Sequence, residues 1–156
     1  MFFEYTRNSK IITKIIKTKS IHEDMIKRII AYTDGSCYPP PNGMMRIGIV
    51  LVENDKIIRE ISEELGEKGT NNTAEYRAVI RALEEALSLG AEEIEIRSDS
   101  QLIVMQLNGL YEVKKPHLKI YYHAIKSLEP KFKKVSYNWI EREKNKYADR
   151  LSKKFI

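Results

Sequence analysis

The sequence predicts an α/β fold in which a mixed β-sheet carries helices on both faces. Three hairpin-linked strands come first, and strands separated by helices follow, in the order β-β-β-α-β-α-α-β-α. Strands joined by tight turns pair antiparallel, whereas strands linked through helical crossovers run parallel, so the sheet is mixed. A chain of 156 residues is long enough for one such domain with a single core.

Three strands are expected in the first half of the domain. The segment KRIIAYTDG (27–35) is mostly apolar and ends at a glycine turn. The segment PPPNG (39–43) is a loop, because three consecutive prolines cannot continue a hydrogen-bonded ladder. The strands at 45–54 and 56–65 meet at Asn54-Asp55, a residue pair that is typical of a tight hairpin.

Helices alternate with strands in the second half. The first helix has an Asn/Thr-rich start, places alanine and leucine on one face, and ends at Gly90. Pro116 lies near the first turn of the third helix and Pro130 follows its end, which are usual places for proline around a helix. The expected elements are helix 71–90, strand 92–98, helix 99–109, helix 115–128, strand 133–141 and helix 145–156.

The domain is expected over residues 25–156, and residues 1–24 form an N-terminal extension to which we assign no catalytic role. In this extension KIITKIIKTKSI alternates pairs of isoleucines with lysines. That spacing fits a short amphipathic helix or an added strand.

The charges are unevenly distributed along the chain, whose net charge is +5. Residues 114–156 contain 13 Lys/Arg and four Asp/Glu, whereas the rest of the chain contains 14 and 18. A basic last third indicates a polyanionic partner held on one side. A solvated lysine-rich surface explains the same charges equally well.

No apolar run reaches the roughly 20 residues needed to span a bilayer, so no membrane partner is expected. The first residues lack the features of a signal peptide, and the single cysteine, Cys37, excludes an internal disulfide. These features predict a cytoplasmic protein, and we expect it to be a monomer.

Four carboxylates lie where an acidic side chain needs an explanation: Asp34, Glu75, Asp99 and Asp149. Asp34 and Asp99 end strands, Glu75 lies in the first turn of a helix, and Asp149 borders the apolar stripe of the last helix. Each alone has a structural interpretation, respectively as a turn residue, a helix cap, a favourable first-turn charge and a surface residue.

Taken together, these carboxylates indicate a metal site. Ligands of open α/β sheets bind outside the carboxyl ends of the strands, where Asp34 and Asp99 are expected. Clustered carboxylates repel one another unless a cation neutralises them, and Mg²⁺ prefers oxygen ligands. Two such ions about 3.5–4 Å apart can activate water and stabilise the leaving oxygen in phosphodiester hydrolysis.

Four motifs, YTDGSC, TNNTAEYRA, SDSQL and NKYADRLS, occur in that order on those elements. Together they resemble type 1 ribonuclease H, in particular the archaeal and bacterial branch that has a short final loop without its histidine. The resemblance covers residues 28–154. It implies the five-stranded ribonuclease H sheet and an endonuclease that hydrolyses the RNA strand of RNA–DNA hybrids, leaving 5′-phosphate and 3′-hydroxyl ends.

By the same resemblance, Asp34, Glu75, Asp99 and Asp149 are the catalytic metal ligands. They would hold two Mg²⁺ ions when substrate is bound, with Mn²⁺ as a substitute. The partner would be the hybrid, and double-stranded RNA is left open as a second substrate. The residues that match the family's substrate contacts are Gly35, Cys37, Thr70, Asn71, Asn72 and Gln101.

The substrate contacts have structural alternatives. Asn and Gln carry donors and acceptors that can read 2′-hydroxyls and base edges across a shallow groove. Gly35 permits close approach of the backbone to nucleic acid. Apart from the motif, however, Asn71-Asn72 would cap the helix, Gln101 would face solvent, and Cys37 would be a small buried hydrophobe.

The chain departs from the family in the loop before Asp149. Arg142 lies where many members have a histidine, and an arginine cannot act as a general base near neutral pH. We assign it to phosphate contact or product release. Asn145 either orients Asp149 or caps the last helix, and we favour the cap; Trp139 is expected in the core.

The extra basic helix of the family is replaced by a segment with only Lys114, Lys115 and Lys119. Two functions other than hybrid cleavage remain open at this stage. One is a nucleic-acid-binding module that has the fold without catalysis, and the other is a related polynucleotidyl transferase.

Overall fold

The computed structural model describes residues 26–153 of the chain. The predicted extension, residues 1–24, lies outside the described residues. Within 26–153, no helix is both long and apolar enough to cross a membrane.

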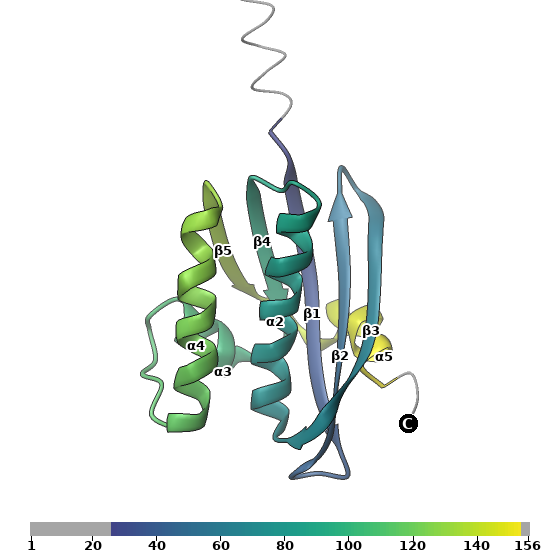
Figure 1. The fold of residues 1–156 in the computed structure, drawn as a ribbon. Coiled ribbons are helices and arrows are strands. Elements are labelled where there is room, and N and C mark those ends of the chain that lie inside the picture. Colours follow the sequence, from purple (N-terminus) through teal and green to yellow (C-terminus); the bar gives the residue numbers. More distant parts are fainter. Residues whose placement is uncertain (1–25, 154–156) are drawn as a thin grey trace, which may run out of the picture.

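A five-stranded mixed sheet forms the centre of the domain, in the order β3-β2-β1-β4-β5 (Figure 1). Its strands are β1 (Arg28–Tyr38), β2 (Gly43–Glu53), β3 (Lys56–Gly69), β4 (Glu93–Ser98) and β5 (Lys134–Trp139). The first three pair antiparallel through short loops, and β4 and β5 join parallel through helical crossovers. The predicted mixed sheet is confirmed.

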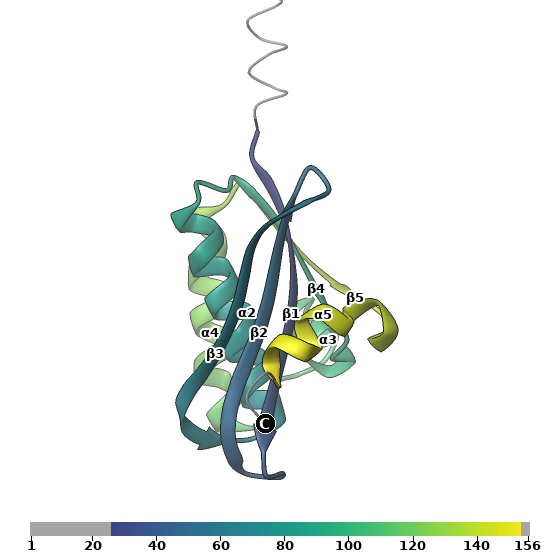
Figure 2. The same ribbon diagram turned by 90° about the vertical axis from the view of Figure 1, so that its right-hand side faces the viewer.

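The helices lie on both faces of the sheet, as predicted. α2 (Asn71–Ser88) and α4 (Pro116–Leu128) cover one face, and α5 (Lys146–Ser152) lies against the other face (Figures 1 and 2). The short helix α3 (Gln101–Leu107) follows β4. The charged segment before α5 is a 3₁₀ turn, η2 (Arg142–Asn145), rather than an open loop.

The hydrophobic core lies between the sheet and α2. Period-2 alternation in β1 and β4 turns one set of side chains toward the helices. On the helix side, the alanines of α2 leave room for the larger strand residues, because they pack with little side-chain volume. Fully buried members of this core include Ile29, Ala31, Ile96, Ala78, Ala82 and Leu83.

The hairpin prediction is confirmed by backbone geometry. Asn54 and Asp55 have φ angles of 50° and 62°, the left-handed conformation that a two-residue hairpin turn requires. β1 and β3 run past their predicted ends, and β3 reaches Gly69 rather than residue 65. β1 runs past Gly35 to Tyr38 because the antiparallel ladder with β2 continues to the pair Tyr38–Met44.

Two glycines let a helix on each face rest directly on the sheet backbone. A Cβ atom on Gly35 in β1 would lie 2.2 Å from the backbone carbon of Ala74 in α2. A Cβ atom on Gly48 in β2 would lie 2.1 Å from the backbone oxygen of Ala148 in α5. Asp34 pairs with Gly48 across the two strands, so both contacts lie beside Asp34.

We expect Gly48→Ala to push α5 away from the sheet, because the added methyl group meets backbone atoms that cannot rotate aside. The free energy of unfolding should fall by about 1–3 kcal/mol, the usual cost of overpacking. Urea unfolding measures this loss, and hydrogen exchange should show faster exchange of the α5 amides.

Gly66→Ala is the matched control. The Cβ there would meet no atom within 4 Å, although φ is +72° and an L side chain is strained. This variant should lose stability without faster exchange in α5. Equal α5 exchange in Gly48→Ala and the wild type would refute the packing explanation.

Candidate active site

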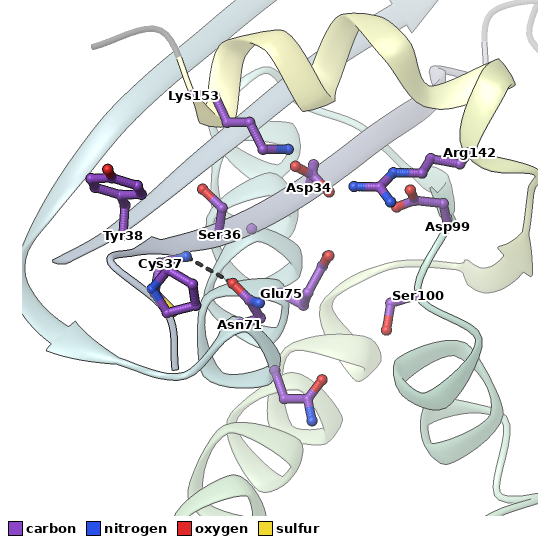
Figure 3. Close-up of a pocket in the computed structure, with 13 residues that line it drawn as sticks. Asp34, Ser36, Cys37, Tyr38, Asn71, Glu75, Asp99, Ser100, Arg142 and Lys153 are labelled. Carbon is purple, nitrogen blue, oxygen red and sulfur yellow. Dashed lines mark hydrogen bonds between the residues drawn. The ribbon is translucent and has the colours of Figure 1, made fainter. Parts of the chain in front are cut away.

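Three of the four predicted carboxylates converge where the parallel pairing of β1 with β4 ends. The prediction that Asp34 ends a strand is wrong, because the ladder between β1 and β2 continues past it to Tyr38. Asp34 lies in β1, Asp99 directly follows β4, and Glu75 lies in the first turn of α2. One carboxylate oxygen from each lies within 4.8 Å of the other two (Figure 3). Asp34 and Glu75 are 5% and 8% exposed, so two charges are almost withdrawn from water.

Each of the three carboxylates is held by a different element of the fold. The Gly35–Ala74 contact brings the first turn of α2 beside β1, and the Gly35 N–H donates to the Glu75 carboxylate. The Ser152 hydroxyl, at the end of α5, donates to Asp34 Oδ2. The side chain of Asn145 donates from Nδ2 to Asp99 Oδ1 at 3.3 Å.

Asn145 corrects one prediction. It occupies the N-cap position of α5 but makes no side-chain cap hydrogen bond. Its side chain is buried and donates instead to the Thr33 carbonyl oxygen at 2.9 Å and to Asp99. The expected cap is therefore wrong, because the close approach of η2 to β1 offers the amide a buried acceptor at Thr33 and a partly buried one at Asp99.

Burial raises the pKa values of two carboxyl groups in the site. The pKa of Asp34 rises from 3.8 to about 6, mainly through burial; the hydrogen bond from Ser152 opposes the rise and the negative charge of Asp99 adds to it. The pKa of Glu75 is raised well above its usual range by burial and then by the charges of Asp34 and Asp99. Carboxylates in this arrangement favour a cation or a proton between them.

The chemistry of the cluster fits a hard divalent cation. Glu75 Oε2 is buried and has no hydrogen-bond partner among residues 26–153. An orphaned carboxylate oxygen beside two further carboxylates supplies the oxygen ligands that Mg²⁺ and Mn²⁺ prefer. The side chains present therefore match the predicted metal site.

Asp149 lies apart from the other three. It is on α5 as predicted, but its carboxylate forms an ion pair with Lys153, which directly follows that helix. Its negative charge still contributes to the raised pKa of Asp34. Asp149 thus borders the cluster without sharing its 4.8 Å group.

Most predicted site residues line one cavity of about 550 Å³ around the three carboxylates. Asn71 accepts a hydrogen bond on Oδ1 from the Cys37 N–H at 2.9 Å, which ties α2 to β1 (Figure 3). The predicted residues on its wall are Asp34, Gly35, Cys37, Asn71, Asn72, Glu75, Asp99 and Arg142. Residues that the sequence reasoning missed are Ser36, Tyr38, Pro40, Ser100 and Lys153.

The helix caps differ from the structural alternatives considered above. Thr70, not Asn71 or Asn72, caps α2, with Oγ1 accepting from the Thr73 N–H at 3.1 Å. Ser100, not Asp99, caps α3. The side chains of Asn71, Asn72 and Asp99 are therefore not engaged in capping.

Two predicted substrate contacts lie beside this cavity rather than in it. Thr70 lines a neighbouring cavity of about 330 Å³ together with Thr73 and His117. Gln101 is exposed at the first residue of α3, directly after Ser100.

Trp139 is not a core residue. It is 48% exposed at the end of β5, an edge strand, and its indole N–H donates to the Asp99 carbonyl oxygen at 3.3 Å. The alternation of β5 places Tyr137 inward instead. Because the chain has one tryptophan, its fluorescence reports on the surroundings of Asp99.

Comparison with known proteins agrees with the fold. Residues 33–155 match the family described as reverse transcriptase-like. A crystal structure of a ribonuclease H1 (LC11) in complex with an RNA/DNA hybrid superimposes with a TM-score of 0.75 at 38% identity, covering 81% of this chain and 94% of that one. The fold and the carboxylates thus define a ribonuclease H-like protein.

Ribonuclease HI of Halobacterium salinarum is 37% identical over 136 residues, which is 86% of this chain and 67% of that protein. The chain belongs to the ribonuclease HI family, the type 1 ribonucleases H. A bifunctional protein of Mycobacterium tuberculosis is 35% identical over 127 residues, which is 80% of this chain. The chain spans about a third (34%) of the length of that relative.

The raised pKa of Asp34 predicts a pH-dependent loss of stability without metal. The group favours its protonated form in the folded state, so its stabilising contribution is complete below about pH 4 and is lost as the pH rises through about 6. The shift corresponds to roughly 3 kcal/mol. The side chain of Asp34→Asn carries no charge. We therefore expect the free energy of unfolding of this variant to lack the part of the decline with rising pH that Asp34 causes.

Urea unfolding at pH 4, 5, 6 and 7 in the presence of a chelator measures the difference between the two proteins. Asp55→Asn, in the exposed β2–β3 turn, is the control and should follow the wild type. Parallel curves for Asp34→Asn and the wild type over this range would contradict the desolvation of Asp34.

Proposed function

We propose that this protein is an endonuclease that hydrolyses the RNA strand of RNA–DNA hybrids, leaving 5′-phosphate and 3′-hydroxyl ends. The observation that carries the proposal is the convergence of Asp34, Glu75 and Asp99 within 4.8 Å, with a buried Glu75 oxygen that has no partner in the described part of the chain. Membership of the ribonuclease HI family supports it.

Asp34, Glu75, Asp99 and Asp149 would hold two Mg²⁺ ions once substrate is bound, or Mn²⁺ in their place. Bound ions supply an activated water and neutralise charge on the phosphate and the leaving oxygen. Ser152 and Asn145 keep Asp34 and Asp99 in their orientations through a buried and a partly buried hydrogen bond, respectively. The carboxylates are thus pre-positioned, and little reorganisation is needed when the substrate arrives.

The hybrid would lie across the cavity wall formed by the start of α2 and the end of β1. Asn71 and Asn72 present amides to the cavity, and Cys37 and Gly35 line it beside them. These groups suit a wide minor groove with 2′-hydroxyls. Gln101, exposed at the start of α3, would extend this contact.

Thr70 would contact a phosphate of the DNA strand. The cavity that it lines lies at the N-terminus of the 18-residue helix α2, where backbone N–H groups favour an anion. Lys114, Lys115 and Lys119 are exposed around the start of α4 and would add non-specific attraction to the backbone.

Arg142 would contact a phosphate from its position on the cavity wall. It is exposed, and its guanidinium points toward the acidic cluster from the turn before α5 (Figure 3). The wall of this cavity contains no histidine. A fixed positive charge there would pair with the newly formed 5′-phosphate and assist its departure.

Hybrid cleavage is tested directly with labelled RNA–DNA hybrid, double-stranded RNA and double-stranded DNA, each with Mg²⁺, with Mn²⁺ and with a chelator. We expect metal-dependent cleavage of the RNA strand of the hybrid. Asp34→Asn should lower the rate by at least about 100-fold, because it removes a charged ligand.

Other outcomes identify the alternatives. Hybrid binding without cleavage under both metals would indicate a binding module without catalysis. Cleavage of double-stranded DNA in preference to the hybrid would indicate another polynucleotidyl transferase. Asp55→Asn, remote from the carboxylates in the β2–β3 turn, is the matched control and should cleave as the wild type does.

Arg142→Ala should lower kcat several-fold while leaving the affinity for metal within about two-fold, because the guanidinium is not a metal ligand. Steady-state kinetics and single-turnover cleavage separate product release from chemistry. Lys144→Ala, in the same turn, is the control. An unchanged kcat would remove Arg142 from the mechanism, and a slower single turnover would assign it to the chemical step.

A further inference from the structure

Lys153 brings a positive charge to the edge of the acidic cluster. It directly follows α5, and its ammonium group donates to the carboxylate of Asp149. The same side chain lines the cavity with Asp34 and Glu75, and Figure 3 shows its amino group pointing toward Asp34. The Lys153 charge also opposes the rise in the pKa of Asp34.

The ion pair distinguishes Asp149 from the buried carboxylates. Among the described residues, Asp34 and Glu75 accept hydrogen bonds from a hydroxyl and a backbone amide and have no ion pair with a lysine or arginine. The charge of the Asp149 carboxylate is already neutralised by the ammonium group of Lys153, and this carboxylate lies outside the 4.8 Å group. Its side chain is 30% exposed and that of Lys153 42%, so water reaches both partners.

We propose that Lys153 is an internal counter-ion that competes with the divalent cation for Asp149. In this view Asp149 joins Asp34, Glu75 and Asp99 only when the cation displaces the lysine. The inference rests on the proposed function and adds to it how metal occupancy of the site is set.

The exchange is physically accessible. Ion pairs between partly exposed side chains are weak, because water and salt compete with them. The lysine side chain has a flexible four-carbon stem. Its ammonium group can therefore move away from Asp149 while α5 keeps its contact with Gly48. A divalent cation carries twice the charge and gains the oxygens of all four carboxylates. It therefore replaces the lysine at a modest cost.

The competition lowers the apparent affinity for the metal. Only the fraction of molecules with Asp149 released binds the cation with all four carboxylates, and the affinity falls in proportion to that fraction. Because the ion pair is weak, removing it should tighten metal binding by about two- to five-fold.

A double-mutant cycle tests the competition: wild type, Lys153→Met, Asp149→Asn and the double variant. Binding of Mn²⁺ alone is measured from the electron paramagnetic resonance signal of the free ion, without substrate. We expect Lys153→Met to bind Mn²⁺ about two- to five-fold more tightly than the wild type. In the Asp149→Asn background the same substitution should change the affinity by less than about 1.5-fold, because the competing partner is absent.

Two further variants separate the ion pair from general electrostatics. Lys153→Arg keeps the charge and should bind Mn²⁺ as the wild type does. Lys146→Met removes one charge from the exposed first residue of the same helix and should have a smaller effect than Lys153→Met. The midpoint of Mg²⁺ activation of hybrid cleavage should shift to lower concentration by the same factor as Mn²⁺ binding.

Unchanged or weaker Mn²⁺ binding by Lys153→Met would overturn the proposal. An equal gain in Mn²⁺ affinity from Lys153→Met in the Asp149→Asn background would also overturn it. The gain would then come from the net charge around the cluster and not from loss of the ion pair. Failure of the proposed function is a separate result. It would appear as absence of hybrid cleavage while the four-protein cycle in Mn²⁺ remains measurable.

Discussion

The candidate site depends on two helices that touch the bare backbone of neighbouring strands. Gly35 and Gly48 lie on adjacent rungs of the β1–β2 ladder, and a Cβ atom at either position would overlap the backbone of α2 or α5. A sheet and a helix normally stand apart by the thickness of their side chains. Removing that layer on both faces brings Glu75 from one helix and Ser152 from the other to the same residue, Asp34.

This close packing has an electrostatic consequence. It buries Asp34 and Glu75 together, and the pKa of each of these carboxyl groups rises because its charge is removed from water and lies beside the negative charge of Asp99. Hydrogen bonds from Ser152 and Gly35 offset part of that penalty without neutralising it. The folding of the rest of the domain therefore holds the carboxylates in an arrangement that a divalent cation stabilises. The burial that destabilises these carboxylates without a cation would also favour binding of one.

Local patterns predicted the elements and their order along the chain well, because each signal acts over a few residues. The Asn54-Asp55 turn and the three-proline loop are examples, since backbone conformation at those positions follows from residue type. The motifs also identified the carboxylates that converge.

The errors concern residues whose environment is decided by distant contacts. Asn145 was expected to cap α5 and instead binds Thr33 and Asp99, 112 and 46 residues away in sequence. Trp139 was expected in the core, but it ends an edge strand.

The last helix shows why a motif alone underestimates such a site. The motif assigns one functional residue to it, Asp149, yet α5 and the residues next to it link to β1, β2 and β3. Ser36 and Ser62 donate to the carbonyl oxygens of Ser152 and Leu151. Since Ser152 also donates to Asp34, the position of α5 on the sheet affects the position of the Asp34 carboxylate, which lies in β1. A substitution anywhere along this contact would thus act on the carboxylate cluster without altering any of its members, and it would do so by moving α5 rather than by changing charge.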